Sequence, residues 1–220
     1  MQPRGPLNLL RTILGAAVEL GALGTLPTFP ATRASRKLPD APSTIEVGAM
    51  LQHAKGWLRI AIALASYAGL RSGEVRALEV RDVDLPNARL HVRRALSEDE
   101  VTTPKSGNER VVPLFPELQA ILTEVMRSKL PRARVVQNGE GKTPTRQAIL
   151  TRLKATLARH ELPQRSFHQL RHFFCSALVS RGASVEAVRL LAGHSNLATT
   201  QRYVHATGDE LRGAIAMFGN

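Results

Sequence analysis

The sequence contains little cysteine, few aromatic residues and no long apolar run. The single cysteine in 220 residues excludes a disulfide framework and a zinc site built on cysteines. Aromatic residues make up 4% of the chain, which disfavours a surface that stacks unpaired bases. No stretch is long and apolar enough to cross a bilayer. A membrane partner is therefore not expected, and the default compartment is the cytoplasm.

Acidic residues are scarce relative to basic ones. The chain has 30 Lys and Arg residues against 18 Asp and Glu residues, a net charge of +12. This excess indicates a polyanionic partner, and duplex DNA phosphate is favoured because the aromatic content is so low. Eleven basic residues fall between positions 127 and 172, where Glu140 and Glu161 are the only acids. A solvated charged face would show the same local pattern, so both interpretations stay open for this segment.

The first 44 residues differ in composition from the rest. Residues 7–24 are apolar but interrupted by Arg11 and Glu19, which favours an amphipathic helix over a signal peptide. Residues 26–44 are rich in Pro, Ser, Thr and basic residues and are predicted to be a linker. One helix cannot bury its own apolar face. Residues 1–25 are therefore expected either to dock on the main domain or to be the tail of another one.

The remaining chain, residues 45–220, is predicted to be an α+β domain that is mostly α. Residues 57–68 are apolar nearly all round, as in a central buried helix that ends at Gly69. Alternation of period two predicts three short antiparallel strands at 78–85, 88–95 and 109–114, the first two joined at Pro86-Asn87. Further helices are expected at 72–78, 116–129, 145–160, 167–180, 184–192, 197–205 and 207–217.

Several short motifs carry groups capable of chemistry, although each motif is weak by itself. His168 and Arg171 are three residues apart after Ser166, so they share one face near a helix start, where an anion is favoured. Arg71 and Glu74 have the same spacing. Surface ion pairs produce these patterns at little energetic gain. His172, which follows Arg171 directly, is expected to point elsewhere.

Four segments in order resemble the tyrosine recombinase, or phage integrase, family. They are GLRSGE (69–74), TPKSGNERVVPL (103–114), SFHQLRH (166–172) and LAGHSNLATTQRYVH (191–205). The resemblance covers roughly residues 45–210. Six positions match the family's catalytic set in the family's order, and none of the six is substituted.

The resemblance implies a role for each matching residue. Tyr203 matches the nucleophile, Arg71 and Arg171 the two arginines that clamp the scissile phosphate, His168 a proton carrier, His194 the later His-or-Trp position, and Lys105 the lysine of the β-hairpin loop. Glu74 would hold the Arg71 guanidinium toward the phosphate. The implied reaction breaks and rejoins double-stranded DNA through a covalent 3′-phosphotyrosyl intermediate, without ATP, a metal or another cofactor.

The resemblance also implies an architecture from which this chain departs. Family members carry a helical core-binding domain before the catalytic domain, and residues 1–25 match only its last helix. The chain is then a truncated or a minimal recombinase, with the linker at 26–44 and the catalytic domain at 45–220. Arg146 and Arg152, on the helix that the family places in a DNA groove, are either DNA contacts or solvated charges. The helix at 207–217 either docks on a neighbouring copy, giving a dimer or tetramer on DNA, or packs on its own core.

Two other functions compete with recombination or integration of DNA. The chain could be a non-catalytic DNA-binding remnant of a recombinase, which its shortness favours and its intact catalytic set disfavours. Relaxation of supercoils, as in type IB topoisomerases, uses the same chemistry but rejoins the phosphotyrosine to its own strand.

Overall fold

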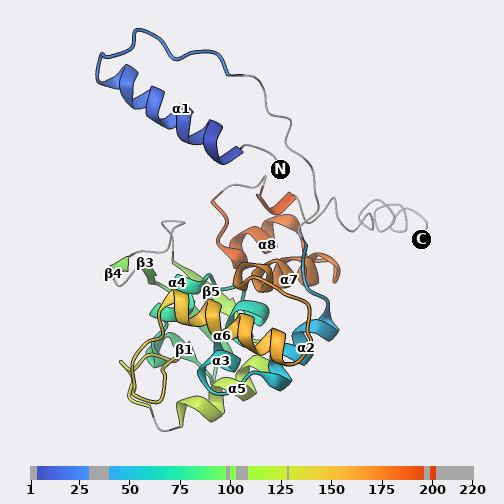
Figure 1. Cartoon of the computed structure of the whole chain (residues 1–220). Helices are drawn as coiled ribbons and strands as arrows, with labels where there is room; N and C mark the ends of the chain where they lie inside the picture. The colour runs from blue at the N-terminus through green and yellow to red at the C-terminus, as the bar shows by residue number, and fades with distance from the viewer. Residues whose placement is uncertain are drawn as a thin grey trace, which may run out of the picture. The chain divides into compact units, whose positions relative to one another are not determined.

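The computed structural model describes residues 4–29, 40–97, 100–102, 109–127, 129–195 and 199–201 (Figure 1). The chain divides into a short unit, Met1–Lys37, and a large unit, Leu38–Asn220. The described part of the short unit, residues 4–29, holds one helix, α1 (Arg4–Glu19), so the helix predicted at 7–24 starts and ends earlier than expected. None of the helices in the described ranges is long and apolar enough to cross a membrane.

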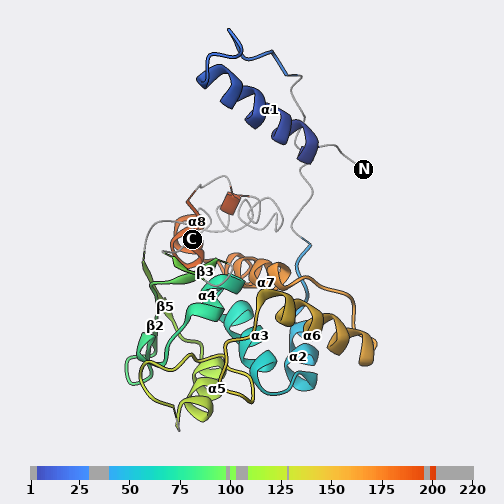
Figure 2. The same cartoon turned by 60° about the vertical axis from the view of Figure 1, so that its left-hand side comes forward.

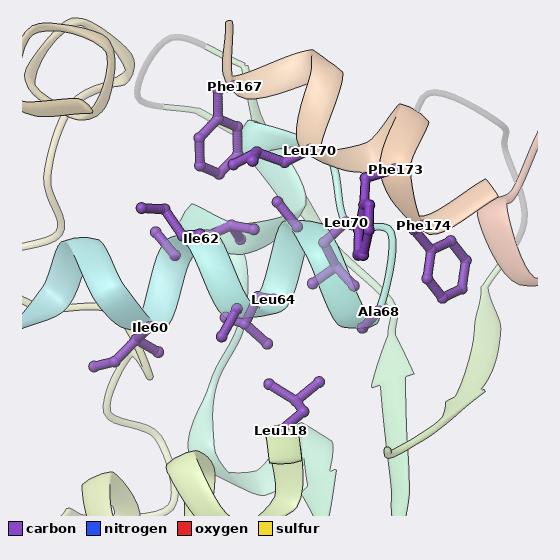
Figure 3. Packing of buried hydrophobic residues seen from close by; sticks show 14 of the residues in the cluster. Ile60, Ile62, Leu64, Ala68, Leu70, Leu118, Phe167, Leu170, Phe173 and Phe174 are labelled. Carbon is purple, nitrogen blue, oxygen red and sulfur yellow. The ribbon is translucent and has the colours of Figure 1, made fainter. Parts of the chain in front are cut away.

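Helix α3 (Trp57–Tyr67) is the centre of the large unit, as its apolar sequence predicts. Leu58, Ile62 and Leu64 are fully buried. Helices α2 (Thr44–His53), α5 (Pro116–Met126), α6 (Arg146–Arg159) and α7 (Phe167–Val179) contact it. Figure 3 shows Phe167 and Leu170 of α7 on one side of α3 and Leu118 of α5 on the other. Each such side chain contributes about 1.5–3 kcal/mol on burial, so this packing holds the surrounding elements in place.

The main sheet is small and antiparallel, which confirms the predicted α+β, mostly α class. It contains β1 (Val83–Asp84), β2 (Arg89–Val92) and β5 (Arg110–Pro113), in the order β1-β2-β5. Leu90 lies opposite Val83 on one side and Val112 on the other, and all three are buried. Helix α8 (Val185–Ala192) contacts β5, which brings the C-terminal part of the described chain to this sheet (Figure 2).

The strand predicted at 78–85 is wrong over most of its length. Only Val83 and Asp84 form a strand, and residues Val80–Asp82 form a 3₁₀ turn. The carboxylate of Asp82 accepts a hydrogen bond from the Glu79 backbone N–H at 2.9 Å, which closes the turn. Arg94 and Arg134 pair with these acids. The alternation of charged and apolar residues that predicted a strand here instead reflects carboxylates that are buried in ion pairs.

The strand predicted at 88–95 is likewise divided between two sheets. It contains β2, and its last residue begins β3 (Ala95–Ser97), which pairs with β4 (Glu100–Thr102) in a separate two-stranded sheet. The third predicted strand is confirmed as β5. Helix α4 (Ser72–Ala77) contacts β3, so this second sheet supports the helix that follows Arg71.

Local capping explains where the helices near the site begin and end. The Ser166 N–H donates to Gln169 Oε1 at 2.6 Å before α7, as the sequence predicts. Gly193 ends α8 with φ of +63°, a left-handed conformation that glycine adopts without strain. The helix predicted at 207–217 lies outside the described residues, as does most of the one predicted at 197–205.

Candidate active site

Arg71 is placed by the turn between α3 and α4. Gly69 has φ of +64° and reverses the chain after α3, and Arg71 then caps α4. The Arg71 backbone N–H donates to Glu74 Oε2 at 2.9 Å, and its Nη1 donates to Glu74 Oε1 at 3.0 Å. Its Nη2 donates to the Gly193 carbonyl at 2.8 Å. One guanidinium thus joins the start of α4 to the end of α8.

Arg171 reaches the same place from α7 and is 1% exposed. Its Nη1 donates to the Gly69 carbonyl at 2.5 Å, and its Nη2 donates to the Ala192 carbonyl. Burial, reinforced by the nearby Arg71 charge, lowers the pKa of Arg171 to about 10. The guanidinium therefore stays protonated at neutral pH, in a position where its charge is poorly solvated.

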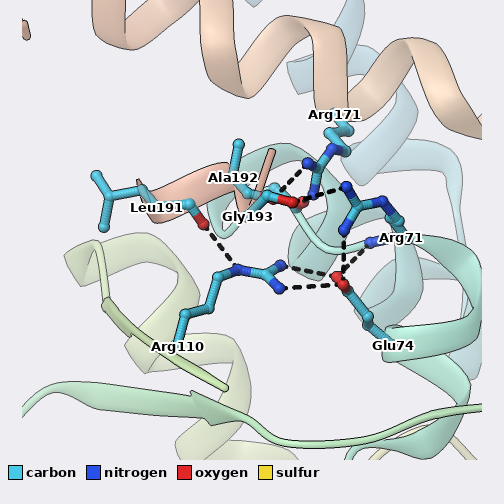
Figure 4. Close-up of polar contacts among 8 residues, drawn as sticks. Arg71, Glu74, Arg110, Arg171, Leu191, Ala192 and Gly193 are labelled. Carbon is cyan, nitrogen blue, oxygen red and sulfur yellow. Dashed lines mark hydrogen bonds and ion pairs between the residues drawn. The ribbon is translucent and has the colours of Figure 1, made fainter. Parts of the chain in front are cut away.

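Three arginines hold three consecutive carbonyls at the C-terminal end of α8 (Figure 4). Arg110 Nε donates to the Leu191 carbonyl at 2.9 Å, next to the Ala192 and Gly193 carbonyls held by Arg171 and Arg71. A helix C-terminus carries partial negative charge and unsatisfied carbonyls, so cations are stabilised there. The end of α8 is thereby the common anchor of guanidiniums from β5, α7 and the start of α4.

Glu74 is the carboxylate within this cluster, and its side chain is 1% exposed. Arg110 forms a bidentate pair with it, Nη1 to Oε1 at 3.0 Å and Nη2 to Oε2 at 2.7 Å. Burial alone raises the pKa of Glu74, but hydrogen bonding and charge from Arg110, with the Arg71 N–H and Arg171, outweigh it and lower the pKa. Glu74 is therefore ionised at neutral pH.

Two histidines of α7 contact each other, and one of them, His168, lies near Arg171 and Arg71. The rings of His168 and His172 meet edge to face with centroids 4.6 Å apart, so His172 does not point elsewhere as expected. Residues four apart lie on the same helical face, which the sequence reasoning overlooked. Desolvation, together with the charges of Arg171 and Arg71, lowers the pKa of His168. A neutral imidazole at pH 7 is able to accept a proton.

His194 follows the turn at Gly193 and is buried, with 8% of its surface exposed. Its Nδ1 lies 2.9 Å from Oγ1 of Thr200, which is fully buried. Burial, followed by the charges of Arg171 and Arg71, lowers the pKa of His194 to about 3. The ring is neutral near pH 7, and the Thr200 contact fixes its orientation.

The cluster has the character of an oxyanion site. Three guanidiniums surround one carboxylate, so positive charge is in excess. A guanidinium has five N–H groups, and the hydrogen bonds above use two on Arg71 and two on Arg171. Other N–H groups therefore remain on both guanidiniums in the described structure. Because the guanidiniums are held in place before any ligand arrives, these remaining donors can stabilise charge that develops on a bound oxyanion.

Four of the six candidate catalytic residues come together in the structure. Arg71, His168, Arg171 and His194 lie near enough for the first three to lower the pKa of the fourth. Lys105 and Tyr203 lie outside the described residues. Sequence reasoning did not single out Arg110 or Thr200. A signal existed for Arg110, because in a strand it shares a face with Val112, which is buried.

Arg146 and Arg152, the candidate DNA contacts, lie on α6, and both side chains are exposed. The Arg152 guanidinium lies over the Trp57 ring, 5.6 Å from its centroid. Arg152 and Trp57 line a cleft of about 630 Å³ formed by α6 and the α2–α3 junction. The other basic or imidazole residues in its lining are His53, Lys55, Arg159 and His160.

Comparison with known families identifies the fold. The model of the phage integrase family matches residues 43–210, so the chain belongs to this family. The match covers α2 to α8. It therefore includes the whole arginine and histidine cluster, which consists of Arg71, Glu74, Arg110, His168, Arg171 and His194.

The curated relatives are named tyrosine recombinases. A tyrosine recombinase XerC of Herpetosiphon aurantiacus is 32% identical over 150 residues, which cover 64% of this chain and 45% of the relative. A tyrosine recombinase XerD of Staphylococcus epidermidis is 31% identical over 201 residues, which cover 83% and 63%. The chain thus spans about half to two thirds of the length of these relatives.

Solved structures show the same fold at low sequence identity. The Tn1549 transposon integrase in complex with a circular intermediate DNA aligns with a TM-score of 0.77 at 21% identity, covering 94% of this chain and 76% of that one. The XerH site-specific recombinase bound to a palindromic difH substrate in a post-cleavage complex aligns with a TM-score of 0.63 at 20% identity, covering 89% and 58%.

Proposed function

We propose that this protein breaks and rejoins double-stranded DNA as a tyrosine recombinase. The observation that carries the proposal is the convergence of Arg71 and Arg171, from elements about a hundred residues apart, on adjacent carbonyls at the end of α8. Arginine forks suit phosphate oxygens geometrically and electrostatically. The net charge of +12 favours a nucleic acid as the source of that phosphate.

The arginines would bind the nonbridging oxygens of the scissile phosphate. Charge grows on these oxygens as a nucleophile attacks, and fixed donors from Arg71 and Arg171 stabilise it most in the transition state. His194, neutral and held by Thr200, would add an imidazole N–H to the same oxygens. Glu74 keeps the Arg71 guanidinium in place and does not touch the phosphate.

The chemical step would be a transesterification by Tyr203. The phenol oxygen attacks phosphorus, the bond to the 5′ oxygen breaks, and a 3′-phosphotyrosyl bond forms. His168 accepts or orients the phenol proton, and Lys105 supplies a proton to the leaving 5′ oxygen. The phosphotyrosyl bond keeps the energy of the broken one, so attack by another 5′ hydroxyl rejoins DNA without ATP. We propose no metal or other cofactor.

The partners and domain roles form part of the same proposal. Residues 45–220 would be the catalytic domain, 26–44 a linker, and 1–25 a helix of a core-binding domain. Copies of the chain would assemble on DNA as dimers or tetramers through residues 207–217. An assembly on DNA of unchanged size after deletion of residues 207–220 would refute this last role.

Covalent capture of DNA tests the proposed chemistry directly. The substrate is a pool of duplexes that are randomised in sequence and nicked near the cleavage point. After attack, the short fragment with the 5′ hydroxyl is lost, so the reaction cannot reverse and the adduct is trapped. A denaturing gel then detects the adduct. We expect an adduct with the natural chain, none with Tyr203→Phe, and equal DNA affinity for both. Arg171→Ala should lose far more cleavage than affinity.

The competing functions give different results in this experiment. Salt-dependent binding without an adduct from the natural chain would indicate a non-catalytic remnant. An adduct accompanied by relaxation of supercoiled plasmid lacking any partner site would indicate topoisomerase-like activity. An adduct that persists in Tyr203→Phe would refute the assignment of the nucleophile.

A further inference from the structure

We propose that Arg110 is a positioning residue for the DNA cleavage proposed above, on which this inference rests. Arg110 lies at the start of β5, and its side chain is 7% exposed. It reaches two different parts of the site at once, Glu74 on α4 and the last turn of α8. Arg71 also joins these two parts, through Glu74 and the Gly193 carbonyl, but Arg110 does so from β5.

The three side-chain nitrogens of Arg110 are all engaged. The two Nη atoms hold the two oxygens of Glu74, and Nε donates to the Leu191 carbonyl. Such a contact needs a planar fork with a third donor, which the single ammonium of lysine does not provide. The geometry is therefore specific to arginine rather than to positive charge.

The first route from Arg110 to the proposed chemistry runs through Glu74. Both oxygens of this buried carboxylate are shared between Arg110 and Arg71. Without Arg110, the only guanidinium hydrogen-bonded to this carboxylate in the described structure would be that of Arg71, and a buried carboxylate with too few partners is costly. The Arg71 guanidinium would then be drawn toward Glu74 and away from a phosphate.

The second route runs through the end of α8. The carbonyl held by Arg110 immediately precedes those held by Arg171 and Arg71, and His194 follows on the same turn. Arg110 also packs directly against this turn, since a Cβ built on Gly193 would lie 3.0 Å from Arg110 Nη1 and 3.2 Å from its Cδ. Arg110 thus fixes the segment that orients both guanidiniums.

Arg110 also ties this assembly to the sheet. Its backbone pairs with Val92 of β2, and the segment containing Lys105 leads into β5. The sheet and the residues proposed to bind the phosphate are therefore connected through the Arg110 side chain. Displacement of reacting groups by about 1 Å costs on the order of 100-fold in rate.

Arg110→Met tests the proposal against a matched control, Arg94→Met. Arg94 also pairs with a largely buried acid, Asp82, at 2.5 Å, but it has no contact with the arginine and histidine cluster in the described structure. We expect single-turnover adduct formation to fall about 100-fold in Arg110→Met, with DNA affinity within about threefold of the natural chain. Arg94→Met should cleave at the natural rate even if both variants melt at lower temperature.

A conservative variant and a pH profile separate positioning from stability. Arg110→Lys keeps the charge but not the fork, so cleavage should recover only partly. Loss of Arg110 removes the main influence that lowers the pKa of Glu74. The acid limb of the cleavage–pH profile should therefore move to higher pH in Arg110→Met and stay unchanged in Arg94→Met.

The outcomes distinguish this inference from the proposed function. No adduct from the natural chain overturns both. Two outcomes overturn the inference alone. In the first, Arg110→Met forms the adduct as fast as the natural chain does. In the second, the Arg110 and Arg94 variants lose equal rate and the pH profile does not shift. If Arg110→Met does not fold, the same comparisons apply to Arg110→Lys.

Discussion

The surroundings of His194 disfavour a positive charge on its ring. This histidine is buried beside Arg171 and within the influence of Arg71, surroundings in which an imidazolium ion is strongly disfavoured. The buried hydroxyl of Thr200 contacts its Nδ1 and thereby favours one ring orientation. A neutral, oriented imidazole can donate to a phosphate oxygen without adding a further unsolvated charge to the cluster.

This environment predicts a loss of folding stability in acid. The pKa of His194 falls to about 3 in the folded chain, against about 6.5 when unfolded. The unfolded state therefore binds the extra proton first as the pH falls. The contribution of neutral His194 to the free energy of unfolding is complete above pH ~6.5. It is lost as the pH decreases toward 3, at up to ~1.4 kcal/mol per pH unit.

Urea unfolding at pH 7.5 and pH 5 measures this effect. The natural chain should lose more stability between these values than His194→Gln, which has no imidazole to protonate. His91→Gln, a substitution on β2, should retain the natural pH dependence. A His194→Gln chain with the same pH dependence as the natural one would contradict the assigned origin.

Among the elements, the helices follow from sequence more closely than the strands do. The apolar pattern of α3 and the cap at Ser166 specify these helices locally, because their causes lie within a few residues. The segment Glu79–Asp82 does not, because its conformation depends on arginines further along the chain. Helix α2, capped by Ser43 and Glu46, was missed because it follows directly on a linker-like composition.

The residues of the candidate site also divide into those that were predicted from the sequence and those that were not. Arg71, His168, Arg171 and His194 were predicted from a family resemblance, since no local pattern brings such distant residues together. Arg110 and Thr200 depend on tertiary packing for their contacts. Their neighbours in the sequence give no hint of Glu74, Leu191 or His194 as partners, and strand periodicity places Arg110 on a buried face without saying why.

Close packing between α4 and β3 predicts opposite effects for two glycine substitutions. A Cβ at Gly73 would lie 2.6 Å from the Leu96 carbonyl, whereas a Cβ at Gly48, in the exposed part of α2, would meet nothing within 4 Å. Gly73→Ala should therefore destabilise the fold by about 1–3 kcal/mol. Gly48→Ala should stabilise it by about 0.5–1 kcal/mol, because alanine loses less backbone entropy in a helix.

Chemical denaturation of both variants measures the two signs. Because α4 begins directly after Arg71, Gly73→Ala should also slow adduct formation, while Gly48→Ala should not. Equal stabilisation by both substitutions would show that α4 and β3 are not in close contact in solution.

At the scale of the whole molecule, stability and charge are distributed differently. The buried hydrophobic cluster of the described residues runs from Val47 to Ala192, entirely within the unit Leu38–Asn220. Residues 1–37 contain five basic residues and one acid, Glu19. The described core thus lies wholly in the large unit, while the short unit adds positive charge.

Removal of residues 1–37 should therefore separate the two properties. We expect residues 38–220 to unfold cooperatively at the same midpoint as the full chain, since no part of the described core is lost. DNA affinity should fall, and its dependence on salt should become shallower, because fewer phosphates are neutralised and fewer counterions released. Titrations of duplex DNA between about 50 and 200 mM salt measure the slope for both chains. An unchanged slope would mean that the basic residues of the short unit make no contact with DNA, and a lowered midpoint would mean that the core of the large unit depends on it.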